Sequence, residues 1–513
     1  MRSAIIVALA AAASAASTPA SLLKRQYHAA KPRLTADALK AHITAENLLA
    51  GSQKLQDFAD AHPNNTRVIG SPGHNDTIYW LKSELEALDY YDVTLQTFSL
   101  VAMVSGQINA VIIDGANTTA GLLEYSASGA VTAPLVPVAN LGCEASDYPA
   151  EVAGNVALIS RGSCEFGLKS ALAGSAGAAA AIIYNNAAGG FNGTLGVPPR
   201  PEGEYLPTVS ISSELAATYL DAISGGATID ATIDVTTVVQ NTSTSNVLAT
   251  TRMGDHSNRL ALGAHSDSVA AGPGINDDGS GTVGVLEVAK ALSKYHVNNA
   301  VTFGFWSAEE EGLIGSTYYV ENLPANESSQ IRAYLNFDMI ASPNYVFGVY
   351  DGDGDAFNIS GPSGSTQIET FFEDFFESAG VNSTPTAFTG RSDYGPFLTA
   401  NIPAGGLFTG AEVLKTEEEE EMFGGEAGVA LDICYHAACD DITNLNMFAY
   451  ELNSKAIAAA VATYATSWEG FPARNTTTVS RRSVVTDQMR KRKQPRHHGH
   501  RHGGCGHVPK ASQ

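Results

Sequence analysis

The pattern of hydrophobic positions changes from a strand period to a helix period between residues 260 and 292. Leu260, Leu262 and Ala264 alternate with their neighbours in a short apolar run, which predicts a β-strand. From Val283 to Leu292 the apolar positions recur with helical spacing, which predicts an α-helix. The Gly-rich turn between them carries four polar side chains: His265, Asp267, Asp277 and Asp278. Because open α/β sheets bind ligands where their strands end, we expect a functional site at this turn.

The same alternation of short apolar runs and helical patterns continues along the chain. Further strands are predicted at 91–100, 301–306 and 333–337. Helices are predicted at 35–62, 77–88, 365–379 and 444–468, the last of them Ala-rich. This is the rhythm of βαβ units. We therefore predict an α/β fold, with a mixed, mainly parallel sheet that is flanked by helices.

Two of these strands lead directly into acidic residues. Glu309 and Glu310 follow strand 301–306, and Asp338 follows strand 333–337. Taken one at a time, such residues have ordinary structural explanations, as when Asp277 or Asp278 caps the next helix. Such structural roles do not explain the whole set, because burying several unpaired acids at strand ends costs free energy. Imidazole with carboxylates is a ligand set that zinc prefers, so the sequence predicts a metal site.

A change of composition marks an inserted segment at 115–239. It is rich in Ala, Gly and Val, has very few Lys or Arg residues and carries no cluster of metal ligands. We expect a separate β-rich domain there, between the two parts of a discontinuous domain at 36–114 and 240–472. The run from Cys143 to Cys164 and the AGAAAAIIYNN run that ends at Asn186 resemble the protease-associated (PA) domain. That resemblance implies a module for substrate gating or interaction rather than catalysis.

The charge and hydropathy of the chain exclude some classes of protein. Its 513 residues are 44% hydrophobic, which is enough for more than one domain with its own core. The net charge of −23 argues against a nucleic-acid partner, since phosphate contacts need clustered Lys and Arg. No segment predicts stable membrane insertion. The composition fits a soluble protein in an acidic or extracellular setting.

The amino terminus has the pattern of a secretory signal at 1–16. Arg2 precedes the apolar run 4–13, and small residues follow it. The dibasic pair Lys24-Arg25 indicates a processing site, so we expect a pro-segment at 17–35. Secretion is therefore the first expectation for localisation, and a vacuole is the second.

Cysteines and glycosylation motifs agree with an oxidising compartment. Of the five cysteines, Cys143 with Cys164 and Cys434 with Cys439 are expected to pair by proximity, which leaves Cys505 over. The nine Asn-x-Ser/Thr acceptors are Asn64, Asn75, Asn117, Asn192, Asn241, Asn326, Asn358, Asn382 and Asn475. Each is a weak signal alone, yet the set suits a secreted glycoprotein.

The carboxyl-terminal segment 473–513 differs from the rest of the chain. It holds ten Lys or Arg residues against one acid, Asp487, and almost no large apolar side chain. We expect it to be disordered. Its five histidines could bind metal, but on composition a solvated tail is the favoured interpretation.

Five motifs together resemble those of the co-catalytic di-zinc aminopeptidases. They are GAHSDSVAAGPGINDDGSGT, WSAEEEGLIGS, NFDMIASPN, GRSDYGPF and CYHAACDD, and they occur in the expected order within 48–468. With the PA insert, the chain resembles in particular the aminopeptidase Y and fungal-type secreted leucine aminopeptidase group. Glu311, which extends the acidic pair to three, and the basic tail depart from the pattern.

The resemblance implies a role for each site residue and two Zn²⁺ ions per chain. His265, Asp277 and Asp338 would hold one zinc. Asp277, Glu310 and His436 would hold the other, with Asp277 as the bridge. Glu309 would be the general base, Asp267 would orient His265, and Arg391 and Tyr435 would contact the substrate carbonyl. We expect a monomer that removes N-terminal residues, apolar ones such as Leu first, from peptides with a free N-terminus.

Other functions remain open at this stage. A carboxypeptidase or dipeptidase on the same scaffold would need a cationic pocket, for which Arg391 is the candidate. A receptor with an inactive site, or one-zinc glutaminyl cyclase chemistry, fits less well because the ligand set is complete. Asp351, Asp353 and Asp355 suggest a calcium loop, but Ala356 and Pro362 replace its expected glycine and glutamate. A solvated loop is favoured there.

Overall fold

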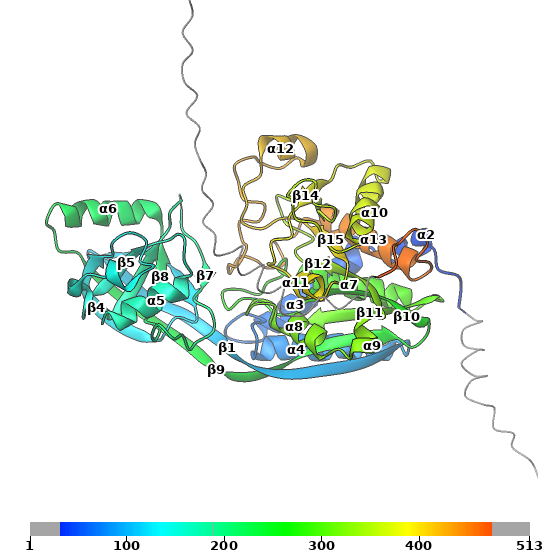
Figure 1. Ribbon diagram of the computed structural model, residues 1–513, viewed down its shortest axis with the longest axis horizontal. Helices are drawn as coiled ribbons and strands as arrows, with labels where there is room; N and C mark the ends of the chain where they lie inside the picture. Colours follow the sequence, from blue (N-terminus) through cyan, green and yellow to red (C-terminus); the bar gives the residue numbers. More distant parts are fainter. Residues whose placement is uncertain (1–30, 188, 475–513) are drawn as a thin grey trace, which may run out of the picture. The chain divides into compact units, whose positions relative to one another are not determined.

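The computed structural model describes residues 31–187 and 189–474 (Figure 1). The predicted signal at 1–16, the Lys24-Arg25 pair, Cys505, the Asn475 acceptor and the basic tail from residue 475 lie outside the described residues. Of the predicted pro-segment, residues 31–35 are described. Leu34 is buried in the main core, and Arg33 forms a β-bridge with His296. These five residues therefore belong to the folded domain.

The predicted mixed sheet is confirmed. Its strands follow the order β14-β13-β15-β12-β10-β11-β9-β4-β5-β6-β8-β3-β7. The strands of the peptidase part are β10 (Asp255–His265), β11 (Asn299–Trp306), β12 (Ile331–Phe337), β13 (Gly348–Tyr350), β14 (Thr384–Thr386) and β15 (Ala404–Phe408). Parallel pairs join β10 to β11 and β12, β12 to β15, and β13 to β14. β9 pairs antiparallel with β11, and β13 pairs antiparallel with β15.

Side chains alternate between the two faces of this sheet, and each face packs in its own hydrophobic core. Leu260 and Leu262 pack in the larger core with α2 (Ala36–Lys40), α3 (Ala45–Asp60), α4 (Pro72–Ala87), α7 (Gly279–Leu292), α10 (Ser365–Ser378) and α13 (Met447–Tyr464). Ala261 points the other way, into a core with α8 (Ile314–Asn322) and α11 (Tyr394–Thr399). Helices therefore flank the sheet on both faces. The short helices α9 (Ala325–Ser328) and α12 (Glu417–Phe423) complete this part.

Two strands are much longer than the sequence pattern predicts. β1 (Tyr91–Ile113) and β9 (Asp230–Thr251) pair antiparallel from one end to the other. Register shifts at 103/105 and 108/110 interrupt the alternation of β1, so the pattern alone ends the strand near residue 100. Through these two strands the insert shares a sheet with the peptidase part.

The insert builds its own cores around the far ends of β1 and β9. Its elements are β2 (Ala116–Asn117), β3 (Gly121–Glu124), β4 (Gly129–Pro137), β5 (Val156–Ser160), β6 (Ala180–Tyr184), β7 (Gly193–Thr194), β8 (Thr208–Ile211), two 3₁₀ turns (Ala145–Asp147 and Ala150–Val152), α5 (Phe166–Ser175) and α6 (Ser213–Ser224). In Figure 1 they form the cyan and green group that carries the labels β4, β5, β7, β8, α5 and α6. β5, β6 and β8 are parallel.

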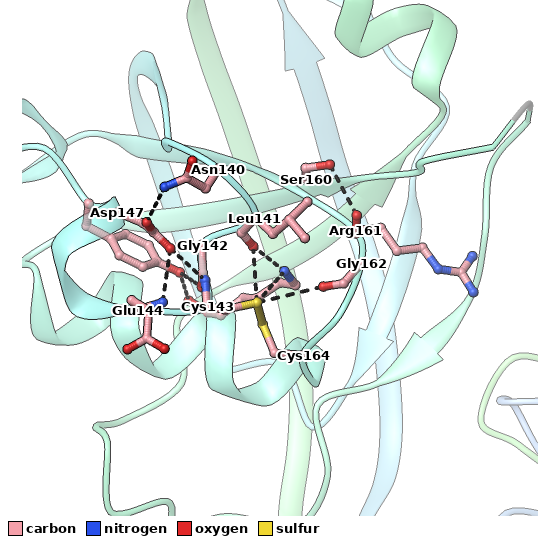
Figure 2. Close-up of a disulfide and its surroundings, with 12 residues drawn as sticks. Asn140, Leu141, Gly142, Cys143, Glu144, Asp147, Ser160, Arg161, Gly162 and Cys164 are labelled. Atoms are coloured by element: carbon pink, nitrogen blue, oxygen red, sulfur yellow. Dashed lines mark hydrogen bonds between the residues drawn. A yellow bond between two sulfur atoms is a disulfide. The ribbon is translucent and has the colours of Figure 1, made fainter. Parts of the chain in front are cut away.

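Both predicted disulfides are present. Cys143 and Cys164 are joined at 2.06 Å in the insert, and Cys434 and Cys439 at 2.11 Å in a loop after β15. Figure 2 shows how Asp147 supports the first bridge, since its carboxylate accepts hydrogen bonds from Asn140 and from the amides of Cys143 and Glu144. No helix among the described residues has the length and apolarity to cross a membrane.

Candidate metal centre

The site lies where the central parallel strands end. His265 is the last residue of β10, Asp338 follows the last residue of β12, and β11 ends at Trp306. After β11 the backbone turns at Ala308, which has a φ of +63°. In a regular strand Glu309 and Glu310 would face opposite ways. The turn at Ala308 takes the chain out of the sheet, so that both glutamates serve the same site.

Asp277 stands between two histidines. One carboxylate oxygen, Oδ1, is 3.2 Å from His265 Nε2, and the other, Oδ2, is 3.2 Å from His436 Nε2. Asp338 Oδ1 lies 3.7 Å from His265 Nε2 on the first side. Glu310 Oε2 lies 3.0 Å from His436 Nε2 on the second. The five residues thus form two groups of three that share Asp277.

Asp278 also lies within reach of His265 and Asp338, but its oxygens are occupied. Oδ2 accepts the His265 amide, and Oδ1 accepts the amides of Gly281 and Met339. Asp278 is therefore the N-cap of α7 and a brace between strand ends. Asp277, which its cis peptide bond joins to Asp278, keeps its carboxylate for the two histidines.

The electrostatics of the site suit a bound cation. Burial by itself would lower the pKa of His265, but Asp277 and Asp338 outweigh it and raise that pKa well above its usual value. Burial would also lower the pKa of His436, but the charges of Glu310 and Asp277 outweigh it and raise that pKa well above its usual value. Burial raises the pKa of Asp277, and the two histidines reverse this and lower it. A field that stabilises imidazolium also attracts a metal ion, which competes with the proton for the same nitrogen.

The donor set fits two zinc ions. Each group offers one imidazole nitrogen and two carboxylates, which is a ligand set found at catalytic zinc sites. Glu310 Oε1 is buried and accepts no hydrogen bond, so this ligand oxygen is uncommitted within the described part of the chain. A buried carboxylate oxygen without a partner is costly, and a metal ion would remove that cost.

Glu309 lies beside both groups without being one of their ligands. It is 8% exposed, and burial raises the pKa of its carboxyl well above the usual value, with Asp338 and Glu310 adding to the effect. A raised pKa is what a proton acceptor needs to work near neutral pH. Glu311 extends the acidic run, and its buried Oε2 likewise lacks a hydrogen-bond partner among the described residues.

Asp267 orients His265 through its main chain. His265 Nδ1 is 3.2 Å from the Asp267 carbonyl oxygen and 3.8 Å from its carboxylate. The carboxylate instead accepts the amides of Glu309 and Glu310, each at 3.3 Å. Asp267 therefore supports the imidazole and the turn that carries the two glutamates.

His436 is held in a short ring closed by the Cys434–Cys439 disulfide. Its φ of +55° is unusual for a residue other than glycine. The Tyr435 ring stacks on the imidazole with centroids 3.8 Å apart. Tyr435 Oη lies 3.1 Å from Arg391, whose guanidinium also pairs with Glu412 at 2.8 Å. Arg391 and Tyr435 thus lie together beside the site, with the charge of Arg391 already matched.

The sequence pattern missed several residues that hold the site loops. Arg67 is fully buried and donates to the main-chain carbonyls of Ser266, Pro273 and Gly274. Asp440 accepts the amides of Asn276 and Asp277 at 2.8 and 3.0 Å. These contacts join residues more than 160 positions apart, so no local sequence pattern predicts them.

Two further groups of candidate residues are placed by the structure. Asp351 is fully buried, and its carboxylate accepts the amides of Gly354 and Phe357, so that it shapes its own loop. Asp353 and Glu369 lie close by. All eight described asparagines of the glycosylation motifs are exposed.

Known proteins are similar to this chain in sequence and in fold. The model of peptidase family M28 matches residues 246–461, and the PA domain model matches residues 131–219. Leucine aminopeptidase 2 of Arthroderma otae is 49% identical over 93% of each chain. An aminopeptidase from Aneurinibacillus sp. strain AM-1 shares the fold with a TM-score of 0.65 at 25% identity, covering 87% of this chain and 98% of its own.

A zinc aminopeptidase from Bacillus subtilis has the same fold, with a TM-score of 0.62 at 24% identity over 84% of this chain and 97% of its own. The chain belongs to peptidase family M28 and carries a PA domain. It is an enzyme, a metalloaminopeptidase.

Proposed function

We propose that the chain removes N-terminal residues one at a time from peptides, with two zinc ions held by the two groups that share Asp277. The single observation that carries the proposal is this shared carboxylate, with one oxygen toward each histidine at 3.2 Å. Two zinc ions at these ligands would polarise the scissile carbonyl and lower the pKa of a water molecule. The remaining steps belong to side chains of the protein.

Glu309 is the general base of this proposal. Its buried carboxylate accepts a proton from the attacking water and returns it to the amine that leaves. Burial keeps the carboxylate away from bulk water and raises its affinity for the proton. Tyr435, whose hydroxyl lies 3.1 Å from Arg391, is placed to donate to the oxygen of the substrate carbonyl as negative charge develops there.

The charge of the site favours a free amino group over a free carboxylate. Two zinc ions would offset the charges of Asp277, Glu310 and Asp338, whereas Glu309 holds no metal in this proposal and its carboxylate is free to attract an amino group. A carboxypeptidase would need an unmatched cation for the substrate carboxylate, and Arg391 is already paired with Glu412. The names of the relatives point to Leu as the preferred first residue.

We also propose that the enzyme is secreted and acts as a monomer. The two disulfides and the exposed glycosylation motifs support an oxidising compartment. Secretion would follow from the signal pattern at 1–16.

A matched pair of peptides tests the activity. Leu-Ala-Phe-Ala with a free amino group and the same peptide with an acetylated amino group are incubated with the enzyme, and products are followed by mass. We expect stepwise loss of residues from the free peptide and no cleavage of the acetylated one. Equal cleavage of both, or loss of residues from the carboxyl end, would contradict the proposal.

A further inference from the structure

A pocket lies between the PA domain and the metal centre. It has a volume of about 250 Å³, which is below the roughly 300 Å³ at which pockets for small molecules begin, so it has room for one long side chain. Its apolar wall comes from the PA side and from the turn before α7: Met103, Ile108, Leu122, Val269 and Ala270. His436 lines it as well, so the pocket opens directly onto a residue of the metal centre.

One acidic side chain, Glu124, lies in this lining. It is the last residue of β3, and its carboxylate is hydrogen-bonded to Thr194 of β7 and lies close enough to interact with the charges of His436 and Glu310. The other charged or amide side chains of the lining are His436, Gln107 and Asn192. A pocket with an apolar wall and one carboxylate matches the side chain of Lys or Arg, which has an apolar stem and a cationic head.

The pocket is open to solvent on one side. Gln107, Asn192 and Ala271 are exposed parts of its lining. An enzyme that removes a single residue needs a closed end for that first residue and an open side for the rest of the peptide. An open pocket beside the metal centre therefore suits the part of the peptide that leaves.

We propose that this pocket binds the side chain of the residue after the scissile bond, and that Glu124 makes Lys or Arg favoured at that position. The inference rests on the proposed aminopeptidase function and assigns the PA domain a direct part in substrate choice. Glu124 is then a specificity-determining residue, distinct from the groups that hold metal or move protons.

The test uses three dipeptide amides, Leu-Lys, Leu-Leu and Leu-Glu, with the full-length enzyme at pH 8. The wild type is expected to prefer Leu-Lys. In Glu124→Gln the ratio of kcat/KM for Leu-Lys over Leu-Leu should fall about tenfold, since a hydrogen-bonded charge pair is lost. In Glu124→Lys the preference should turn toward Leu-Glu. Glu151→Gln, an exposed glutamate of the same domain outside the pocket, should keep the wild-type ratio.

A second series, Lys-Leu against Leu-Leu, locates the effect. If Glu124→Gln changed kcat/KM only in this series, the pocket would bind the first residue of the substrate, and its assignment to the residue after the scissile bond would be wrong. Equal loss on all substrates with unchanged zinc content would overturn the specificity role. Failure of the proposed function is distinguishable, because the wild type would then release no N-terminal residue from any of these substrates.

Discussion

Asn192 of the PA domain donates a hydrogen bond across 3.0 Å to the main-chain carbonyl of His436. His436 needs such support because its backbone has a positive φ and its imidazole lies 3.0 Å from Glu310. The disulfide ring holds this residue from the peptidase side, and Asn192 holds it from the PA side. The inserted domain therefore contributes to the geometry of the metal centre.

Replacing Asn192 should weaken one metal site and leave the other. Partners that orient metal ligands typically contribute about tenfold to a hundredfold in metal affinity. The bond from Asn192 to His436 is exposed, so we expect the lower value, about a tenfold loss of affinity for one zinc in Asn192→Ala. Zinc retention is measured by titration with a competing chelator. Because the substitution also removes a glycosylation motif, the wild type freed enzymatically of its N-linked glycans is the control. Equal weakening in Asn192→Ala and in the deglycosylated wild type would assign the effect to the glycan.

Arg67 should be essential for stability. It is fully buried, and its guanidinium binds three carbonyls of the loop that carries the site. Arg67→Met leaves the carbonyls of Ser266 and Pro273 without this donor, whereas the Gly274 carbonyl keeps its bond from the Gly279 amide. We expect a loss of about 3 to 5 kcal/mol in the free energy of unfolding. Urea unfolding measures it. Arg252→Met, which breaks an exposed ion pair with Asp89 and Asp92, should cost less than about 1 kcal/mol. Similar losses in the two variants would contradict this account.

Removing metal should lower both activity and stability. Without a cation, the buried carboxylates of Asp277, Glu310 and Asp338 repel one another in a dry site. A ligand at a thousand times its Kd contributes about 4 kcal/mol, so the melting temperature should fall by several degrees in a chelator and return with zinc. The same chelator saturated with zinc is the control. Hydrolysis that resists the free chelator would exclude a metallopeptidase.

Much of the peptidase part was predictable because its pattern is local. The alternation at Leu260, Leu262 and Ala264 and the helical spacing after Val283 predict β10 and α7, and both are confirmed. Helix α4 begins five residues before the predicted 77, because Ser71 caps it and Pro72 occupies its first turn. The bulges of β1 interrupt the two-residue alternation of apolar and polar positions, so this alternation does not predict the second half of the strand.

The supporting contacts of the site were beyond sequence reasoning. Arg67 and Asp440 act through main-chain groups far along the chain, where any residue type supplies the same carbonyl or amide. The orienting atom of Asp267 is likewise a carbonyl rather than its carboxylate. Side-chain chemistry identifies candidate ligands, whereas tertiary packing decides which main-chain groups orient them.

Two neighbouring substitutions separate the general base from the metal ligand. Glu309→Gln cannot accept a proton, and the loss of a general base typically lowers kcat by about 10² to 10⁴. Its zinc content should stay near that of the wild type, since Glu309 holds no metal in this account. Glu310→Gln should weaken one zinc site, because a neutral amide oxygen is a poorer ligand than a carboxylate.

The most direct test is therefore bound zinc per chain, measured alongside turnover in these two variants and the wild type. We predict two zinc ions in the wild type, two in an almost inactive Glu309→Gln, and loss of one from Glu310→Gln. Zinc lost from Glu309→Gln but kept by Glu310→Gln would reverse the two roles. Full activity in both variants would show that the centre around Asp277 is not the active site.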